Sequence, residues 1–309
     1  MKKTIYTLFA LLMLSSMQAE QFKLQLNLKK GESYRQKMNS DMSIAQNVGG
    51  TDMNIKMNIT AGVLYKVIGI SNDLYEMEVF YENMSMKMNM PGVDMAFDSE
   101  NDVPDNPQSK MLSNMLRTMV NKSFFMKLSK TGKVSEVKGV DSLFAHMFDN
   151  VPEIGEAQKQ QFYKQMSDAY GEKALKGNFE MSAAIFPDKA VSQGDKWNIK
   201  TELNSGMQMQ VSTDYTLNGI SDSAYHLLGT SAMNTINNDS VSVVNGMPMR
   251  YDMSGNMAID MQIDRVTGWV MVARIIQKFS GTAYIQDNAQ VPGGLTLPMT
   301  INSVMVIRD

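Results

Sequence analysis

A strict alternation of apolar and polar residues constrains this chain more than any other feature. It is cleanest at residues 84–90, where every second residue is a methionine (Met84, Met86, Met88 and Met90). Successive side chains of a strand point to opposite faces, so a period of two predicts strands with one buried face. The same alternation recurs at residues 22–28, 53–59, 63–70, 75–80, 207–211 and 257–263. The chain is therefore expected to consist mainly of antiparallel strands.

The period changes from two to that of a helix in the middle of the chain. Asn106 is a good N-cap and Pro107 a good first helical residue. Two further helices are expected, a short one capped by Asp141 and one over residues 156–170 that ends at Gly171. Between the first two helices, residues 124–137 predict a hairpin that turns at Thr131-Gly132.

This segregation of helices and strands predicts an α+β protein with mainly antiparallel sheet. Three modest helices cannot cover the apolar faces of about a dozen strands. The strands must therefore pack sheet on sheet, or form curved sheets or part-barrels around a cavity.

The chain also contains one pattern twice. The run Tyr65-x3-Gly69-Ile70-Ser71-x3-Tyr75 returns at 215–225 as Tyr215-x3-Gly219-Ile220-Ser221-x3-Tyr225. A glycine and an aromatic residue precede each copy, and a Thr-Gly pair follows each copy. We interpret the chain as two related β units with a helical segment between them.

The repeated landmarks are expected to be structural, because an active site would not usually occur twice. Glycine permits a turn or a bulge, an acidic side chain can accept backbone N–H bonds, and the aromatic ring packs. These residues are Gly31, Tyr34, Gly69, Gly132, Gly194, Asp195, Trp197, Gly219 and Gly268.

Four segments follow from these patterns. Residues 1–19 have two lysines, a short apolar run and a small-residue end, which is the pattern of a secretory signal peptide. Residues 20–103 form the first β unit. Residues 104–175 form the helical segment, with a β-hairpin that belongs to the first unit, and residues 176–309 form the second β unit.

Charge and hydropathy limit the partners. The net charge of −3 argues against nucleic acid and anionic membrane surfaces, which both attract basic proteins. No stretch after residue 19 is apolar enough to span a bilayer. The chain has no cysteine, which excludes disulfides and thiol chemistry. We expect an exported, soluble protein of the periplasm or the extracellular space.

No catalytic motif is present. The chain has two histidines, His146 and His226, which lie far apart in the sequence. It has no nucleophile elbow, zinc-protease motif or phosphate-binding loop. We therefore expect no enzyme, no catalytic residues and no cofactor.

The 31 methionines give the sharpest functional hypotheses. Methionine is adaptable and frequent at apolar binding surfaces, so Met84, Met86, Met88 and Met90 could bind a lipid or another apolar ligand. The same four thioethers could instead hold Cu(I). Because methionine also occurs throughout the chain, a third possibility is that it replaces Leu, Ile and Val as core filler.

The run FPDKAVSQGDKW at residues 186–197, the late Thr-Gly hairpin and the amino-terminal signal together resemble an uncharacterised family of exported, β-rich proteins of Gram-negative bacteria. The family carries no established activity, so the resemblance implies no catalytic residues. More remotely, the architecture resembles the periplasmic lipoprotein-carrier and lipid-carrier folds, which implies an apolar ligand.

These observations predict a non-enzymatic protein of the cell envelope that binds an apolar ligand or an envelope partner on a methionine-rich sheet surface. One alternative is a structural or interaction protein without a small ligand. The second alternative is a methionine-rich Cu(I)-binding protein.

Overall fold

The computed structural model describes residues 20–103, 106–145, 147, 155–205, 207–236, 241–244 and 247–309. The predicted signal peptide and His146 lie outside the described residues.

One antiparallel sheet dominates the described part of the chain. Its path is β6-β5-β3-β2-β1-β13-β12-β11-β9-β8-β7, with β4 paired to β3 and β10 paired to β11. The strands are β1 (Ser33–Val48), β2 (Thr51–Ser71), β3 (Leu74–Met90), β4 (Val93–Asp98), β5 (Ser123–Ser129), β6 (Val134–Lys138), β7 (Lys196–Ser205), β8 (Met207–Ile220), β9 (Ala224–Thr235), β10 (Ser242–Val244), β11 (Met247–Asp264), β12 (Val270–Ile285) and β13 (Leu295–Arg308). The predicted α+β class with mainly antiparallel sheet is confirmed.

The helices lie between β4 and β7, with the β5–β6 hairpin inserted among them. They are α2 (Pro107–Met119), α3 (Val140–Ala145), α4 (Glu156–Tyr170) and α5 (Glu172–Ala183). As predicted, the Asn106 side chain caps α2 by accepting hydrogen bonds from the backbone N–H groups of Gln108 and Ser109. Gly171 ends α4, also as predicted.

The first residues assigned to the second β unit, 176–183, are helical rather than extended. Residues 172–183 continue the helical segment as α5, because Ala174, Leu175 and Gly177 recur at helical spacing on its buried face. A short apolar stretch of this kind cannot be told from a strand by periodicity alone. The boundaries at residues 103 and 175, as a division into domains, stay a prediction.

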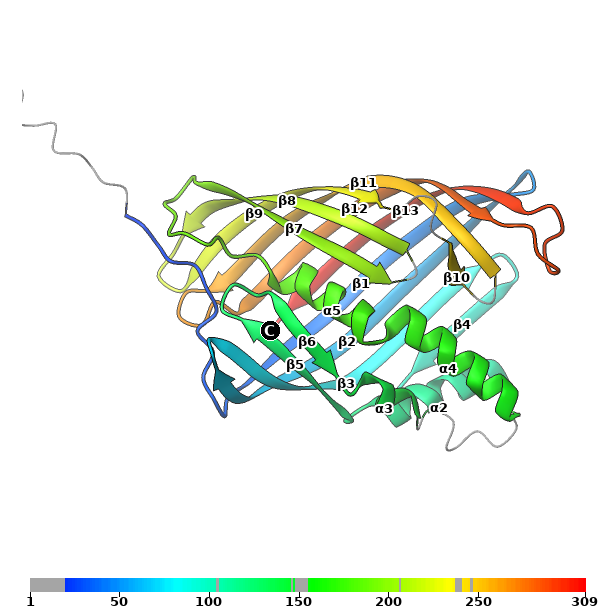
Figure 1. Cartoon of the computed structure of the whole chain (residues 1–309), viewed down its shortest axis with the longest axis horizontal. Coiled ribbons are helices and arrows are strands. Elements are labelled where there is room, and N and C mark those ends of the chain that lie inside the picture. Colours follow the sequence, from blue (N-terminus) through cyan, green and yellow to red (C-terminus); the bar gives the residue numbers. More distant parts are fainter. Residues whose placement is uncertain are drawn as a thin grey trace, which may run out of the picture.

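The sheet curls until its two edge strands approach the same helix (Figure 1). Helix α5 contacts β7 on one side and β6 on the other. At Gly177 the approach to β7 is so close that a methyl carbon there would lie 2.8 Å from the Glu202 carbonyl oxygen. The sheet is thus open but wraps around α5, and its helix-covered face is concave.

The concave face of the sheet forms a trough, and the segment before β1, residues 22–28, closes one end of it. The backbone N–H of Leu26 donates to the carbonyl of Lys130 at 2.8 Å, and that of Asn27 donates to the carbonyl of Thr267 at 2.8 Å. Both acceptors lie in the predicted Thr-Gly turns, so the segment runs between the two hairpins. Its alternate side chains point into the core, where they are buried (Leu24, Leu26 and Leu28).

The sheet contains the same strand order twice. The order β6-β5-β3-β2-β1 in one half corresponds to β12-β11-β9-β8-β7 in the other, and β13 joins the halves. One cluster of buried residues runs through both halves, and a smaller one forms around Met249 and Leu297. The halves therefore share a core. An ancestral duplication stays our interpretation of this order.

Candidate functional site

The two copies of the repeated motif adopt the same local structure. The N–H of Gly31 donates to the carbonyl of Val67 at 2.8 Å, as the N–H of Gly194 does to the carbonyl of Leu217 at 2.8 Å. Both glycines have positive φ, +90° and +93°. The strand pairing shifts register just before Gly69 in one copy and just before Gly219 in the other.

The two aromatic residues of the motif pack against other rings, as a structural role requires. Tyr34 lies against the Trp269 ring, with the centroids 5.2 Å apart. Trp197 stacks on Tyr215 at 5.9 Å and donates from Nε1 to the carbonyl of Ile185 at 2.9 Å.

The remaining three shape turns. The Asp195 carboxylate accepts a 2.8 Å hydrogen bond from the N–H of Ser192. Gly132 and Gly268 have φ of +83° and +71° in their hairpin turns. Their backbones lie against Ala183 and Gln25, where a methyl carbon would clash.

The strand pairing identifies the residues on the concave face. Tyr65 on β2 is buried in the core, so Val63, Ala61 and every second residue before them share its face. Cross-strand partners lie on the same face, which extends the assignment to β1, β3, β4, β12 and β13.

Beyond the core, the concave face of β1 to β4 carries apolar side chains that are only half-buried. Among the described residues they belong to neither cluster of buried residues. We call this set the Met surface: Met42, Ile44, Met53, Ile55, Met57, Ile59, Met86, Met88, Met90, Met95 and Phe97.

A row of four methionines crosses the Met surface. Met42 pairs with Met57, Met57 with Met88, and Met88 with Met95, on four adjacent strands. Neighbouring strands lie about 4.8 Å apart, closer than the ~6.6 Å between same-face residues along a strand. The methionines therefore line up across the sheet as well as along β3.

The structure separates the four methionines predicted as a site. Met86, Met88 and Met90 lie on the Met surface, whereas Met84 packs against the main core cluster. Sequence reasoning missed Met42, Met57 and Met95, because their place beside Met88 depends on strand register. Alternation in their own segments indicates a shared face within each strand but cannot show which strands are neighbours.

Two polar residues on the next two strands extend this row of methionines across the sheet. Met42 pairs with Ser303, which pairs with Gln277 on β12. Ser303 Oγ lies 3.3 Å from Gln277 Oε1, and Gln277 Nε2 lies 3.4 Å from the Met257 sulfur. A hollow of about 1170 Å³ follows this row, and its lining includes all six members together with residues that flank them on the strands.

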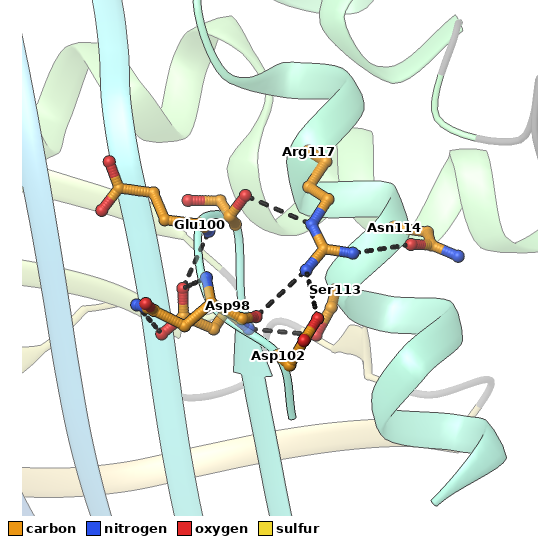
Figure 2. Close-up of polar contacts among 8 residues, drawn as sticks. Asp98, Glu100, Asp102, Ser113, Asn114 and Arg117 are labelled. Carbon is orange, nitrogen blue, oxygen red and sulfur yellow. Dashed lines mark hydrogen bonds and ion pairs between the residues drawn. The ribbon is translucent and has the colours of Figure 1, made fainter. Parts of the chain in front are cut away.

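Helix α2 covers the free edge of β4 and so borders the Met surface. The backbone N–H groups of Ala96 and Asp98 donate to Ser109 Oγ at 3.4 Å and to Ser113 Oγ at 3.0 Å. Figure 2 shows Arg117 of the same helix holding the loop after β4, where its Nη2 donates to the Asn101 carbonyl at 3.0 Å. An edge capped in this way cannot pair with another strand there.

The ionisable groups of the described residues include one histidine beside a carboxylate. His226 Nε2 lies 2.6 Å from Asp260 Oδ1, and its other ring nitrogen lies 3.2 Å from the Asn218 amide nitrogen. Burial raises the pKa of Tyr81, on the concave face, to about 12, so its phenol stays neutral. Within the described ranges, no group of three or more His, Cys, Asp or Glu could hold a metal ion. No described helix is both long and apolar enough to cross a membrane.

Solved structures give distant likenesses. A lipovitellin structure matches 91% of this chain at 7% identity with a TM-score of 0.47, and the chain spans about a quarter (25%) of that protein. An outer membrane channel from Pseudomonas putida F1 matches 92% of this chain and 97% of its own at 7% identity, with a TM-score of 0.26. The translocator domain of the autotransporter NalP from Neisseria meningitidis matches 92% and 90% at 6% identity, with a TM-score of 0.20. Such likenesses say nothing about ligand or activity.

Comparison with curated proteins found no match. A family profile matches residues 72–270, which is more than half of the chain, and confirms the predicted resemblance to an uncharacterised β-rich family. The chain belongs to the family of unknown function DUF6263.

Proposed function

We propose that this protein binds an apolar, chain-shaped ligand, such as the acyl chain of a lipid, on the Met surface. We further propose that it does so without catalysis, as an exported soluble protein of the cell envelope. The observation that carries the proposal is the half-buried Met surface on the concave face, outside both core clusters.

The shape and chemistry of this surface fit such a ligand. Methionine side chains are flexible and polarizable, so they adjust to irregular apolar molecules. The row from Gln277 on β12 to Met95 on β4 crosses six strands, which is about 24 Å. One leaflet of a bilayer has a hydrocarbon depth of ~15 Å, so the row can accommodate a single acyl chain.

Binding would also explain why these side chains are methionines. A rigid core is best filled by Leu, Ile and Val. The main buried cluster of the described residues contains many of these, such as Val67, Val79 and Leu217, and methionine makes up ten of its 41 residues. On the Met surface the share of methionine is higher, seven of eleven residues.

The test is native mass spectrometry of the protein purified gently from its own compartment. We expect a bound mass that matches a lipid, released by organic solvent. Bare protein in gentle preparations, and no uptake of added monoacyl lipid, would leave the structural or interaction role. Crosslinking to envelope partners would then be the next measurement.

Cu(I) binding is the second candidate, and the row of Met42, Met57, Met88 and Met95 favours it. Soft thioethers select Cu(I), and the row brings four of them onto adjacent strands. The double substitution Met57→Leu and Met88→Leu separates the candidates, because it removes two sulfurs and keeps apolar volume. Lipid binding should survive it, whereas a stoichiometric Cu(I) adduct should be lost.

A further inference from the structure

The concave face beside the Met surface contains one hydrogen-bond donor with a poor partner. Gln277 Nε2 lies 3.4 Å from the Met257 sulfur, and a thioether is a weak acceptor. The oxygen of the same amide already lies 3.3 Å from Ser303 Oγ. The amide N–H would be better satisfied by an oxygen, because an amide–carbonyl hydrogen bond is stronger than one to sulfur.

The side chains that share the concave face with Gln277 carry no charge. Three lysines of these strands, Lys56, Lys87 and Lys278, also line the hollow, but each stands next to a concave residue, so its side chain points to the opposite face of the sheet. The concave positions of β1 to β4, β12 and β13, all within the described residues, contain no Asp, Glu, Lys, Arg or His. A carboxylate at this place would lose hydration without gaining a cation from the concave side chains of these strands, which is unfavourable. A neutral carbonyl would not carry this cost.

We infer that the ligand of the Met surface is a neutral acyl ester or acyl amide, held at its carbonyl by Gln277. This inference rests on the proposed function. The carbonyl oxygen of the ligand accepts a hydrogen bond from Gln277 Nε2. This bond replaces the contact between Gln277 Nε2 and the Met257 sulfur. The acyl chain then runs across β13 and β1 to β3 along the methionine row. Gln277 thus selects the head of the ligand, and the methionines bind its tail.

The test compares three probes with the same 18-carbon chain on the full mature protein. They are monoolein, oleate at a pH where it is ionised, and octadecene, each measured by displacement of a bound apolar dye. We expect monoolein to bind more tightly than both others. Gln277→Met keeps the side-chain length and removes the amide. It should therefore weaken monoolein affinity about 5-fold, which is the effect of losing one hydrogen bond. It should leave octadecene binding unchanged.

The matched control is Gln262→Met, which changes an exposed glutamine on β11. It should alter no affinity. Equal monoolein affinity in wild type and Gln277→Met, or oleate binding as tight as monoolein, would overturn the assignment of Gln277 while leaving an apolar site in place. If the wild type binds none of the three probes, the proposed function itself fails.

Discussion

The backbone of Gly268 lies directly against the carbonyl oxygen of Gln25, so closely that a methyl carbon built on Gly268 would overlap that oxygen. This contact joins the late hairpin turn to the segment before β1. The neighbouring hydrogen bond from Asn27 N–H to the Thr267 carbonyl, at 2.8 Å, makes the same connection. The closed end of the trough therefore depends on a residue with no side chain at position 268.

Gly268→Ala should destabilise the fold more than Gly194→Ala does. Both glycines have positive φ, which costs alanine of order 1 kcal/mol. No atom lies within 4 Å of a methyl carbon at Gly194, whereas Gly268 adds the clash with Gln25. We expect a loss of about 1 kcal/mol for Gly194→Ala and about 2–4 kcal/mol for Gly268→Ala, measured by urea unfolding. Equal losses would contradict the role of the Gln25 contact.

Trp197→Ala should destabilise the protein by roughly 3–5 kcal/mol in urea unfolding. The substitution removes the stacking on Tyr215 and the hydrogen bond to the Ile185 carbonyl. Trp197→Phe keeps an aromatic ring and loses the N–H donor, so it should cost less, about 1–2 kcal/mol. A loss below about 1 kcal/mol for Trp197→Ala would mean that the motif is not structural.

Acid should weaken the late hairpin through Asp264. Burial alone would raise the pKa of this carboxyl, but hydrogen bonds from Thr267 and Val266 outweigh it and hold the pKa below the ordinary 3.8. A lowered folded-state pKa stabilises the fold above the unfolded value, and this contribution is lost as pH falls through the folded value.

Asp264→Asn removes the titration and keeps an acceptor oxygen. Between about pH 6 and about pH 3, its unfolding free energy should fall less steeply than that of the wild type. Urea unfolding at several pH values measures both slopes. Parallel slopes would show that Asp264 does not contribute to acid sensitivity.

Local patterns in the sequence predict the elements that depend on neighbours in the chain. The alternation at 84–90 predicts a strand, Asn106-Pro107 predicts the start of α2, and both Thr-Gly turns are found where they are expected. These features follow from side-chain period, caps and turn chemistry, which act over a few residues.

The site depends on contacts between distant segments, so only part of it is predictable. Met88 is identifiable from its own strand. Its neighbours Met57 and Met95 become visible only when the pairing of β2, β3 and β4 is known. Met84 has the same alternation as Met88, yet a register shift near Gly62 and the adjoining core place it against buried residues. Helix α5 is missed because its short apolar stretch fits a helix or a strand equally well. The close approach of Gly177 to the β7 backbone, which places this helix, exists only in the folded protein.

The most direct test of the account is the affinity of a monoacyl lipid for Met57→Asp/Met88→Asp, measured by dye displacement against wild type. Two carboxylates at the centre of the methionine row should weaken binding at least about 10-fold, equivalent to 1.4 kcal/mol. Met271→Asp, which changes an exposed methionine outside the Met surface, is the matched control and should bind as the wild type does. Unchanged affinity in the double variant, with the fold intact, would contradict ligand binding on the Met surface.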